Sequence, residues 1–319
     1  MNIMVTGVAG FIGSNLAQTL IQAGHVVVGI DNLSAGTREN VPAGVDLRQA
    51  DIRSKEIYPL FQGRDAVFHL AAKNCLLDCL HNPVETADIN VGGTANVLEA
   101  ARLAGVRKFV YADSSAEYEG VPDLPSRIER IDPQGAYAVS KRGGALFCET
   151  YHRYFGLNVT ILRYFNVYGP AQDFRRVIPP VMSAFILKML KGDAPVIYGT
   201  GEKRRDFIYV DDVNRFHLLV LKDARTSGRT YNVGSGSNYS VNDIFRLIED
   251  ILQTGLKPIH QAPLPNDADA TLADLADSLT LGWKPEIAIR EGLRLTVDYL
   301  KSKIETEARL GAAGLGRTT

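Results

Sequence analysis

The chain has 319 residues, enough for one large domain or two modest ones. Hydrophobic residues make up 45% of it and charged residues 22%, which allows a sizeable core and excludes a globally disordered chain. The formal net charge is −1 without a visible basic stripe, so we expect no nucleic-acid partner. We also expect no membrane partner and a soluble cytoplasmic protein, because no apolar stretch reaches the roughly 20 residues of a membrane span and no signal peptide is visible.

The first sixteen residues carry the strongest local pattern. Residues 2–6 are a short apolar run that predicts a buried parallel strand, and the glycine-rich turn G-V-A-G-F-I-G and a helical pattern follow. Glycines let the backbone turn tightly beside a phosphate, and a helix N-terminus offers free N–H groups and a positive dipole end. We therefore expect a pyrophosphate to bind at Gly7, Gly10, Phe11, Ile12 and Gly13.

An acidic residue follows the second predicted strand, His25–Ile30. Asp31 lies about twenty residues past the glycines, where a carboxylate accepts hydrogen bonds from an adenosine ribose. It would repel a 2′-phosphate, so the pattern favours NAD over NADP, with Asn32 beside it at the same site. The alternative is an ordinary strand–helix–strand unit with a solvated aspartate.

Further strands alternate with helices along the next 130 residues. Strands are predicted at 46–50, 66–70, 108–112 and 158–164, with helices at 83–104 and from Tyr137 to about Phe155. This alternation predicts an α/β protein with a doubly wound parallel Rossmann sheet. The residues expected beside the cofactor at the strand ends are Asp51, Ile52, Leu70, Ala71, Ala72, Lys73 and Tyr164. Asn90 is buried by its helical pattern, so it needs hydrogen-bonding partners, and we place it at the same site.

The pattern changes after Asn166. A helix near 180–190 and a short strand at 196–198 indicate a smaller, discontinuous C-terminal α/β substrate lobe. We divide the chain into a cofactor domain at 1–166, to which 205–234 return, and a substrate lobe at 167–204 and 235–305. Residues 306–319 are expected to form a flexible tail.

Tyr137 and Lys141 stand four residues apart on one predicted helix and therefore share a face. A cation beside a phenol lowers the pKa of that phenol, and an activated tyrosine can remove a hydroxyl proton as hydride leaves the same carbon. Ser114 and Ser115, at the end of the fifth strand, are placed to hydrogen-bond that hydroxyl. Y-x-x-x-K by itself is a common pattern, and it gains weight here from the nucleotide fold in front of it.

The motifs together resemble the extended short-chain dehydrogenases that act on nucleotide sugars, such as UDP-galactose 4-epimerase and dTDP-glucose 4,6-dehydratase. The resemblance covers about residues 1 to 300 and rests on G-V-A-G-F-I-G, D-N-L-S, H-L-A-A, S-S-A, Y-A-V-S-K, R-Y-F-N-V-Y-G-P and R-D-F-I-Y-V-D-D. It implies a tightly held NAD, Tyr137 as base, Lys141 on the nicotinamide ribose and Ser115 at the sugar O4. The shared first step would be oxidation of a hexose at C4.

The resemblance also implies the substrate site and the assembly. Asn166 would meet the diphosphate or the sugar, and Arg205 would pair with the diphosphate, unless it forms an ion pair with Asp206 or Asp211. The residues implied for the uridine pocket are Val181, Ile197, Tyr198 and Gly199. A UDP-sugar, with UDP-N-acetylglucosamine as first guess, is the expected substrate, and helices 83–104 and 137–155 would pair across a two-fold axis in a homodimer.

Two departures from the family pattern bear on the reaction. Glu117 falls where 4,6-dehydratases carry the glutamate that removes the C5 proton, while Ala116 replaces their acid. Cys75, Cys79, Asp78 or a water are candidates for that missing acid. An arginine usual in the second lobe is also absent, because Leu264-Pro265-Asn266-Asp267 stands where R-P-G-D is common.

These features leave three functions open. Glu117 favours loss of water across C5–C6 after C4 oxidation. The unusual Tyr118-Glu119 pair, a third departure, suggests a specialised pocket, as for forming an unsaturated hexose like that of tunicamycin assembly. The alternative is a UDP-hexose 4-epimerase, in which Glu117 is structural and hydride returns to the other face. A non-catalytic NAD-sensing module is the third, although such relatives tend to lose the Tyr/Lys pair that this chain keeps. We predict no metal site, and we interpret the three cysteines, Cys75, Cys79 and Cys148, as buried or pocket-lining thiols.

Overall fold

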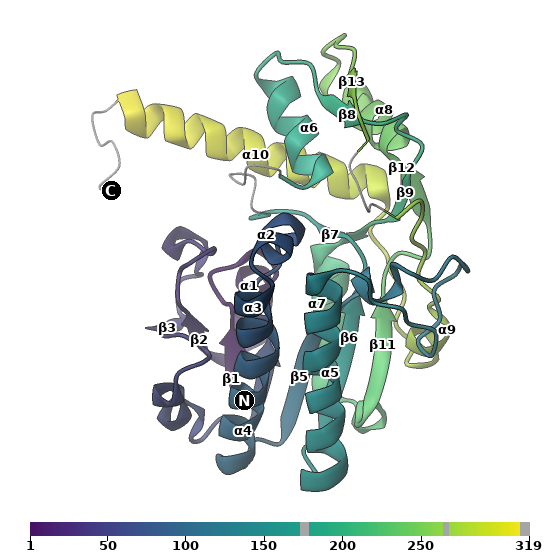
Figure 1. The fold of residues 1–319 in the computed structure, drawn as a ribbon. Coiled ribbons are helices and arrows are strands. Elements are labelled where there is room, and N and C mark those ends of the chain that lie inside the picture. The colour runs from purple at the N-terminus through teal and green to yellow at the C-terminus, as the bar shows by residue number, and fades with distance from the viewer. Residues whose placement is uncertain (173–178, 264–267, 313–319) are drawn as a thin grey trace.

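The computed structural model describes residues 1–172, 179–263 and 268–312. A parallel sheet of seven strands in the order β11-β6-β5-β4-β1-β2-β3 forms the larger lobe. Its strands are β1 (Asn2–Thr6), β2 (Val26–Asp31), β3 (Asp46–Gln49), β4 (Ala66–His69), β5 (Lys108–Ser114), β6 (Val159–Tyr164) and β11 (Arg229–Val233). The order turns outward on both sides of β1 and β4, as in a doubly wound sheet, and the carboxyl ends of the strands point toward the smaller lobe (Figure 1).

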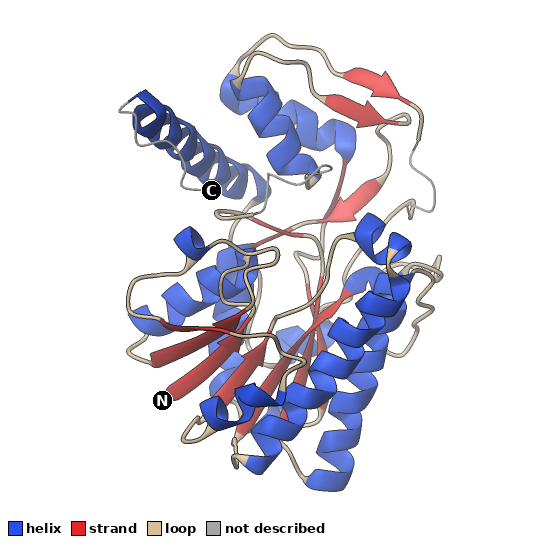
Figure 2. Ribbon diagram, turned by 60° about the vertical axis from the view of Figure 1, so that its left-hand side comes forward, coloured by secondary structure: helices blue, strands red, loops and turns tan. Residues whose placement is uncertain are grey.

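Helices cover both faces of this sheet (Figure 2). On one face lie α1 (Phe11–Gln22) and α7 (Val210–Lys222), which pack on a core that includes Ile3, Val5, Leu16 and Phe216. On the other lie α4 (Thr94–Leu103), α5 (Ala136–Phe155) and the 3₁₀ segment η2 (Lys55–Phe61), with a second core around Phe109 and Tyr111. Burial on both faces explains why the central strands β1, β2 and β4 are nearly continuous apolar runs and not alternating ones, whereas the edge strand β3 is polar and mostly exposed.

The smaller lobe is assembled from short elements around a third core. Its elements are α6 (Val181–Leu190), β8 (Val196–Tyr198), β9 (Arg204–Asp206), β12 (Asn238–Ser240), α8 (Val241–Leu252), β13 (Ile259–Gln261) and α10 (Ile289–Ala312). The pairs are β8 with β13 and β9 with β12, and α6, α8 and α10 share a core around Phe185, Ile248 and Val297. A further pair, β7 (Val167–Tyr168) with β10 (Ile208–Tyr209), lies between the two lobes (Figure 1).

The remaining elements are short segments on the larger lobe. They are η1 (Arg38–Asn40), α2 (Leu76–His81), α3 (Pro83–Ala87), the π-helical turn η3 (Asp88–Gly93), η4 (Ser115–Tyr118), η5 (Ala224–Thr226) and α9 (Ala276–Thr280). The helix expected at 83–104 is therefore three segments, with its two consecutive glycines inside the π-helical turn.

The predicted Rossmann sheet and substrate lobe are both present. α7 and β11 pack on the large sheet as expected for residues returning to it, whereas β9, at 204–206, pairs within the smaller lobe. α10 continues to Ala312, past residue 306 where we expected the flexible tail to begin. Among the described residues, no helix is long and apolar enough to cross a membrane.

Candidate active site

The glycine-rich turn joins β1 to α1 beneath the smaller lobe. Gly7 has a φ of +74°, and a Cβ there would lie 2.7 Å from the amide nitrogen of Ala71, so only glycine fits. A Cβ on Gly13 would collide with the Gly7 carbonyl. Helix α1 begins after Gly10 with no side-chain cap and no acidic residue in its first turn. The turn therefore offers a close backbone approach and an unneutralised helix N-terminus, which suit the pyrophosphate of a dinucleotide.

Asp31 ends β2 beside this turn. One of its carboxylate oxygens accepts a hydrogen bond from the Ala9 amide at 2.9 Å and the other from the Leu33 amide at 2.8 Å. Farther out, the Asn32 side chain donates to Asp51, which Arg53 also holds, and these bonds lower the pKa of Asp51. The residues expected around the adenosine are thus brought together, with the Asp31 side chain held in place by two backbone amides.

Asn90 lies fully buried between the loop after β4 and helix α5. Its side-chain oxygen Oδ1 accepts a hydrogen bond from the Lys73 backbone amide at 2.8 Å. Its side-chain amide group donates to the Lys73 backbone carbonyl and to the Ser140 hydroxyl, both at 2.9 Å. Ser140 in turn donates to the Tyr137 carbonyl. The prediction that Asn90 is buried and needs partners is confirmed, and these partners link the cofactor side of the sheet to the helix that carries Tyr137.

A second buried chain of hydrogen bonds, which we call the histidine cluster, consists of Thr6, His69 and Thr94. Nδ1 of His69 lies 2.7 Å from the Thr6 hydroxyl and Nε2 lies 3.0 Å from the Thr94 hydroxyl. Thr94 donates its own proton to the Asn90 carbonyl, so we assign the His69 proton to Nε2. Burial lowers the pKa of His69 to about 3, so the ring is neutral. The sequence analysis missed this cluster.

The hydroxyl that contacts Tyr137 belongs to Ser114, and Ser115 is the first residue of η4. Burial raises the pKa of Tyr137 to about 12, while the Ser114 hydrogen bond opposes that rise. Burial also lowers the pKa of Lys141 to about 8. The expected lowering of the Tyr137 pKa is therefore not found, because desolvation of the phenolate outweighs the favourable contacts.

Helix α5 lies unusually close to the sheet at this site. The Lys141 ammonium is 4.2 Å from the centre of the Tyr111 ring, and the Tyr111 hydroxyl donates to the Lys141 carbonyl at 3.1 Å. Gly144 faces the same hydroxyl, and a Cβ at position 144 would collide with it. The face of α5 that carries Tyr137 and Lys141 is thus held against β5, whose end carries Ser114.

Glu117 is fully buried and belongs to a group that we call the arginine cluster, made up of Asp113, Glu117 and Arg163. Arg163 donates from Nε to Asp113 at 3.0 Å and from Nη2 to Glu117 at 2.7 Å. Its Nη1 donates to the Tyr118 hydroxyl, which itself donates to Asn232 on β11. Burial, reinforced by Asp113, raises the pKa of Glu117 to about 8. Asp113 and Arg163 were not singled out from sequence, because each lies inside an apolar strand.

The residues expected at the substrate are distributed over the smaller lobe and its junction. Asn166 donates to the Asp206 carbonyl at 2.9 Å, and Arg205 donates to the Arg204 carbonyl at 2.8 Å. Val181 begins α6, Tyr198 ends β8 with 40% of its surface exposed, and Gly199 follows with a φ of +71°. Ile197 has no exposed surface and packs in the core of the smaller lobe, so it does not line a pocket as expected.

Arg204 directly precedes Arg205 in the chain. It lies on β9 and donates to the side chain and the carbonyl of Asn238 at 2.9 and 2.8 Å, because β9 pairs with β12. The departure at Leu264–Asp267 lies outside the described residues.

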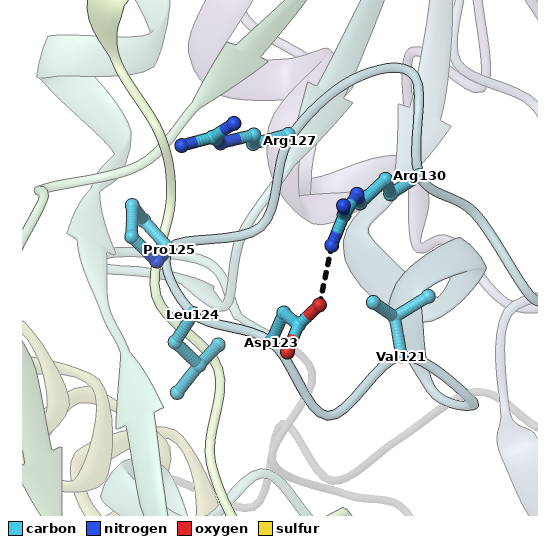
Figure 3. Close-up of a pocket in the computed structure, with 6 residues that line it drawn as sticks. All are labelled: Val121, Asp123, Leu124, Pro125, Arg127 and Arg130. Atoms are coloured by element: carbon cyan, nitrogen blue, oxygen red, sulfur yellow. Dashed lines mark hydrogen bonds and ion pairs between the residues drawn. The ribbon is translucent and has the colours of Figure 1, made fainter.

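Two surface cavities lie away from Tyr137, Lys141 and Ser114. One, of about 300 Å³, is lined by the 121–130 loop, where Arg130 forms an ion pair with Asp123 and Arg127 lies across from them (Figure 3). The other, of about 750 Å³, is lined by residues around Arg53 and Pro83. Neither lining includes Tyr137, Lys141 or Ser114, so geometry and not cavity size defines the candidate active site.

The three cysteines form no disulfide bond among the described residues. Cys79 and Cys148 are buried, Cys75 is half-buried, and all three are free. Cys79 lies on α2, where its thiol donates to the Lys73 carbonyl at 3.5 Å, and burial raises its pKa. In the parts of the chain that the structure describes, no group of three or more His, Cys, Asp or Glu residues could hold a metal ion.

The chain belongs to the NAD dependent epimerase/dehydratase family, whose model matches residues 3–234. It is 33% identical to a UDP-glucose 4-epimerase of Mycolicibacterium smegmatis over 95% of this chain and 99% of that one. Its fold is similar to that of Thermotoga maritima UDP-glucose 4-epimerase with UDP-glucose (TM-score 0.92, 34% identity, 95% and 100% of the two chains). A dTDP-glucose 4,6-dehydratase from Streptomyces venezuelae is also similar (TM-score 0.87, 28% identity, 96% and 98%). The protein is therefore an NAD-dependent enzyme that acts on nucleotide sugars.

Proposed function

We propose that the protein is a UDP-hexose 4-epimerase. The observation that carries this choice over a dehydratase is the position of Glu117, which has no exposed surface and is bonded to Arg163. A base that removes the C5 proton must reach the substrate within hydrogen-bond distance or through one water. Elimination of water therefore lacks its base, whereas epimerisation at C4 requires only groups that the Tyr137 site provides.

Each residue of the site has a role in this proposal. NAD, held by the glycine turn and Asp31, would supply the hydride acceptor for C4 of the sugar and the hydride donor for return to the other face. Tyr137 removes the proton of the O4 hydroxyl and gives it back, and the Ser114 hydroxyl, which touches the Tyr137 phenol, orients O4. Lys141, held against Tyr111, supplies a positive charge that favours the phenolate. Ser115, the first residue of η4, remains proposed at the sugar O4 beside Ser114.

The cofactor residues divide by the part of NAD that they would hold. The glycine turn and the start of α1 bind the pyrophosphate, and Asp31 with Asn32 binds the adenosine ribose. Asp51 and Ile52 flank the adenine, and the loop from Leu70 to Lys73 lies along the nicotinamide half. Asn166 and Arg205, at the junction with the smaller lobe, are proposed to meet the diphosphate of a UDP-sugar. Val181, Tyr198 and Gly199 are proposed for the uridine side.

Product analysis in deuterated water tests the reaction. We expect UDP-glucose or UDP-N-acetylglucosamine to give its C4 epimer with unchanged mass and no deuterium at C4 or C5, as read by NMR and mass spectrometry. A product that has lost water, or that carries deuterium at C5, would establish elimination instead and would overturn the proposal.

Replacing the base gives the largest loss of activity. Tyr137→Phe removes the proton acceptor while keeping the ring, so we expect kcat to fall by about 10²–10⁴-fold. The content of bound NAD, measured after denaturing the protein, should stay unchanged because the phenol hydroxyl is not needed to retain the cofactor. Wild-type turnover in this variant would remove Tyr137 as the base, and loss of NAD would make it a cofactor ligand only.

A homodimer is the assembly we propose for this enzyme. Apolar side chains stand exposed at a spacing of seven or eight residues along α5, at Val139, Leu146, Phe147 and Tyr154, the last with 73% of its surface exposed. Leu103 on α4 is exposed as well. A soluble protein rarely leaves such a stripe uncovered, and a second copy would bury it.

Sedimentation measures this assembly directly. Wild-type protein should sediment as a dimer, and Phe147→Glu should shift it to monomer by placing a charge in the contact. Glu149→Gln, on the same helix, is the control and should leave the dimer intact. A wild-type monomer would reject the assembly.

A further inference from the structure

We propose that Asp113 and Glu117 share one proton, and that this protonated pair, closed by Arg163, positions Ser114 for the reaction. The inference goes beyond the proposed function, although its importance for catalysis rests on the role of Ser114 there. It makes Asp113, Glu117 and Arg163 positioning residues, since none of them reaches the sugar.

The three side chains hold the two ends of one short segment. Asp113 and Arg163 are direct register partners on the neighbouring strands β5 and β6. Glu117 comes four residues later from η4, and the same guanidinium reaches it through a different nitrogen. The segment between the two carboxyl groups contains Ser114 and Ser115. One arginine therefore fixes both ends of the turn whose first serine contacts Tyr137.

Two oxygens of this cluster lack a partner among the described residues. Asp113 Oδ1 and Glu117 Oε1 are buried and accept no hydrogen bond, although the other oxygen of each carboxyl group is held by Arg163. The two carboxyl side chains are nevertheless within hydrogen-bonding reach of each other. Two carboxylates cannot bond to each other, but a carboxylic acid can donate to a carboxylate. A single proton between them satisfies both oxygens at once.

The charge balance leads to the same result. With both carboxyl groups ionised, the cluster would carry two negative charges against one guanidinium in a place without solvent. A shared proton makes the cluster neutral and avoids the penalty of an unpaired buried charge.

The other titratable or charged groups around the cluster come from four elements. They are Tyr111 on β5, Tyr118 on η4, Tyr164 on β6, and Tyr137, Lys141, Arg142 and Cys148 on α5. Lys141 and Arg142 are cations, yet neither forms a described hydrogen bond to either carboxyl group, and burial raises the pKa of Glu117 to about 8 despite them. The surrounding charges therefore do not replace the proton.

Loss of the proton would reach the catalytic groups through the backbone and through charge. Repulsion between the two carboxylates would separate the ends of the 113–117 turn and displace the Ser114 hydroxyl from Tyr137. Negative charge on Asp113 already raises the pKa of Tyr137, and a second charge nearby would make the phenolate harder to form.

Infrared spectroscopy of the resting protein, without substrate, tests the pair itself. We expect the carbonyl band of a protonated carboxyl group at pH 6, its loss as the pH rises through about 8, and its absence in Glu117→Gln. Glu129→Gln, which changes an exposed glutamate of the following loop, is the matched control and should keep the band. A band that survives in Glu117→Gln, or that is absent from wild type at pH 6, overturns the proposal.

Thermal melting gives a second reading on the same variants. Glutamine copies the protonated glutamate, because its amide donates to Asp113 while its oxygen accepts from Arg163. In wild type the unfolded chain releases the proton above about pH 4.3 while the folded chain keeps it to about pH 8. The wild-type melting temperature, relative to that of Glu117→Gln, should therefore fall as the pH rises between these values. A pH-independent difference overturns the proposal.

The pH profile of turnover separates positioning from mere structural support. Both proteins should lose some kcat above about pH 8 as Lys141 gives up its proton, but wild type should lose more than Glu117→Gln at an unchanged KM, because only in wild type does the pair also ionise. Parallel profiles would overturn the positioning role even if the proton is found. Should Glu117→Gln fail to fold, Asp113→Asn gives the same three readings, because its amide can donate to Glu117. If product analysis in deuterated water shows a reaction other than C4 epimerisation, the proposed function fails. The infrared, melting and pH-profile measurements still test the shared proton, so the two failures can be told apart.

Discussion

The histidine cluster and the arginine cluster are both buried beside the candidate active site, but their buried polar groups find hydrogen-bond partners in different ways. His69 donates once and accepts once between two threonines, so its chain is complete without any charge. The arginine cluster contains one cation and two acids, and two of its oxygens are unpartnered until a proton is added. A neutral cluster is fixed by hydrogen-bond direction alone, whereas a charged one also depends on the solution pH.

The two clusters consequently give pH dependences of opposite sign. Burial raises the pKa of Glu117 to about 8, so its contribution to stability is complete at acid pH and is lost as the pH rises. Burial lowers the pKa of His69 to about 3, so its contribution is complete above the unfolded value of about 6.5 and is lost as the pH falls. The two ranges overlap from about pH 4.3 to about pH 6.5, and within this overlap each contribution is only partly present.

Removing the cation should have the larger effect. Arg163→Met keeps most of the side-chain volume but leaves two buried carboxyl groups without their donor, so we expect a loss of about 3–5 kcal/mol in the free energy of unfolding. Urea denaturation at pH 8 measures it. Because protonation relieves the carboxylates, the loss should shrink at pH 5.

The conservative exchange Arg215→Met is the comparison variant, since Arg215 also bonds a buried aspartate, Asp212, but is itself partly exposed. Its loss should be smaller than that of Arg163→Met. Equal losses for the two variants, or a loss at Arg163 that does not change with pH, would contradict the account of the arginine cluster.

Removing the imidazole should have a smaller effect with the opposite pH dependence. His69→Leu leaves the Thr6 hydroxyl without its acceptor, and we expect a loss of about 1–3 kcal/mol at pH 7. Leucine does not titrate, so the advantage of wild type over this variant should decrease as the pH falls from 7 to 5. Urea denaturation at both values measures the change, and a growing advantage at pH 5 would show that the buried ring is charged.

Much of the larger lobe could be predicted because its strands and turns are local patterns. Residues 2–6 are found as β1, and the turn from Gly7 to Gly13 and the acid at Asp31 occupy the positions that strand, glycine and helix signals indicate. Tyr137, Lys141 and a serine could be placed at one site for the same reason, since Tyr137 and the serines lie at element boundaries and Lys141 follows Tyr137 on the same helix face. The sequence could not decide which serine touches Tyr137, because that depends on where β5 ends.

The two clusters could not be predicted because their residues are far apart in the sequence and become neighbours only when the strands pair in the sheet. Asp113 is 50 residues from Arg163, and Thr6 is 63 residues from His69. Within the local motif, Glu117 has the position of a catalytic carboxylate, and only the cross-strand arginine reveals its burial. The short strands of the smaller lobe likewise carry little periodicity, which is why Ile197 was expected at a ligand and lies in a core.

Gly144 shows a conflict between helix stability and active-site geometry. An alanine in the middle of a helix is favoured over glycine by about 1 kcal/mol, and this exchange is among the simplest ways to strengthen a protein. At position 144 the exchange of glycine for alanine is not tolerated. The added methyl group would collide with Tyr111, push α5 away from the sheet and carry Tyr137 away from Ser114. The enzyme therefore keeps a weaker helix so that its reactive groups stay within reach of each other, and a search for heat-tolerant variants should leave this residue untouched.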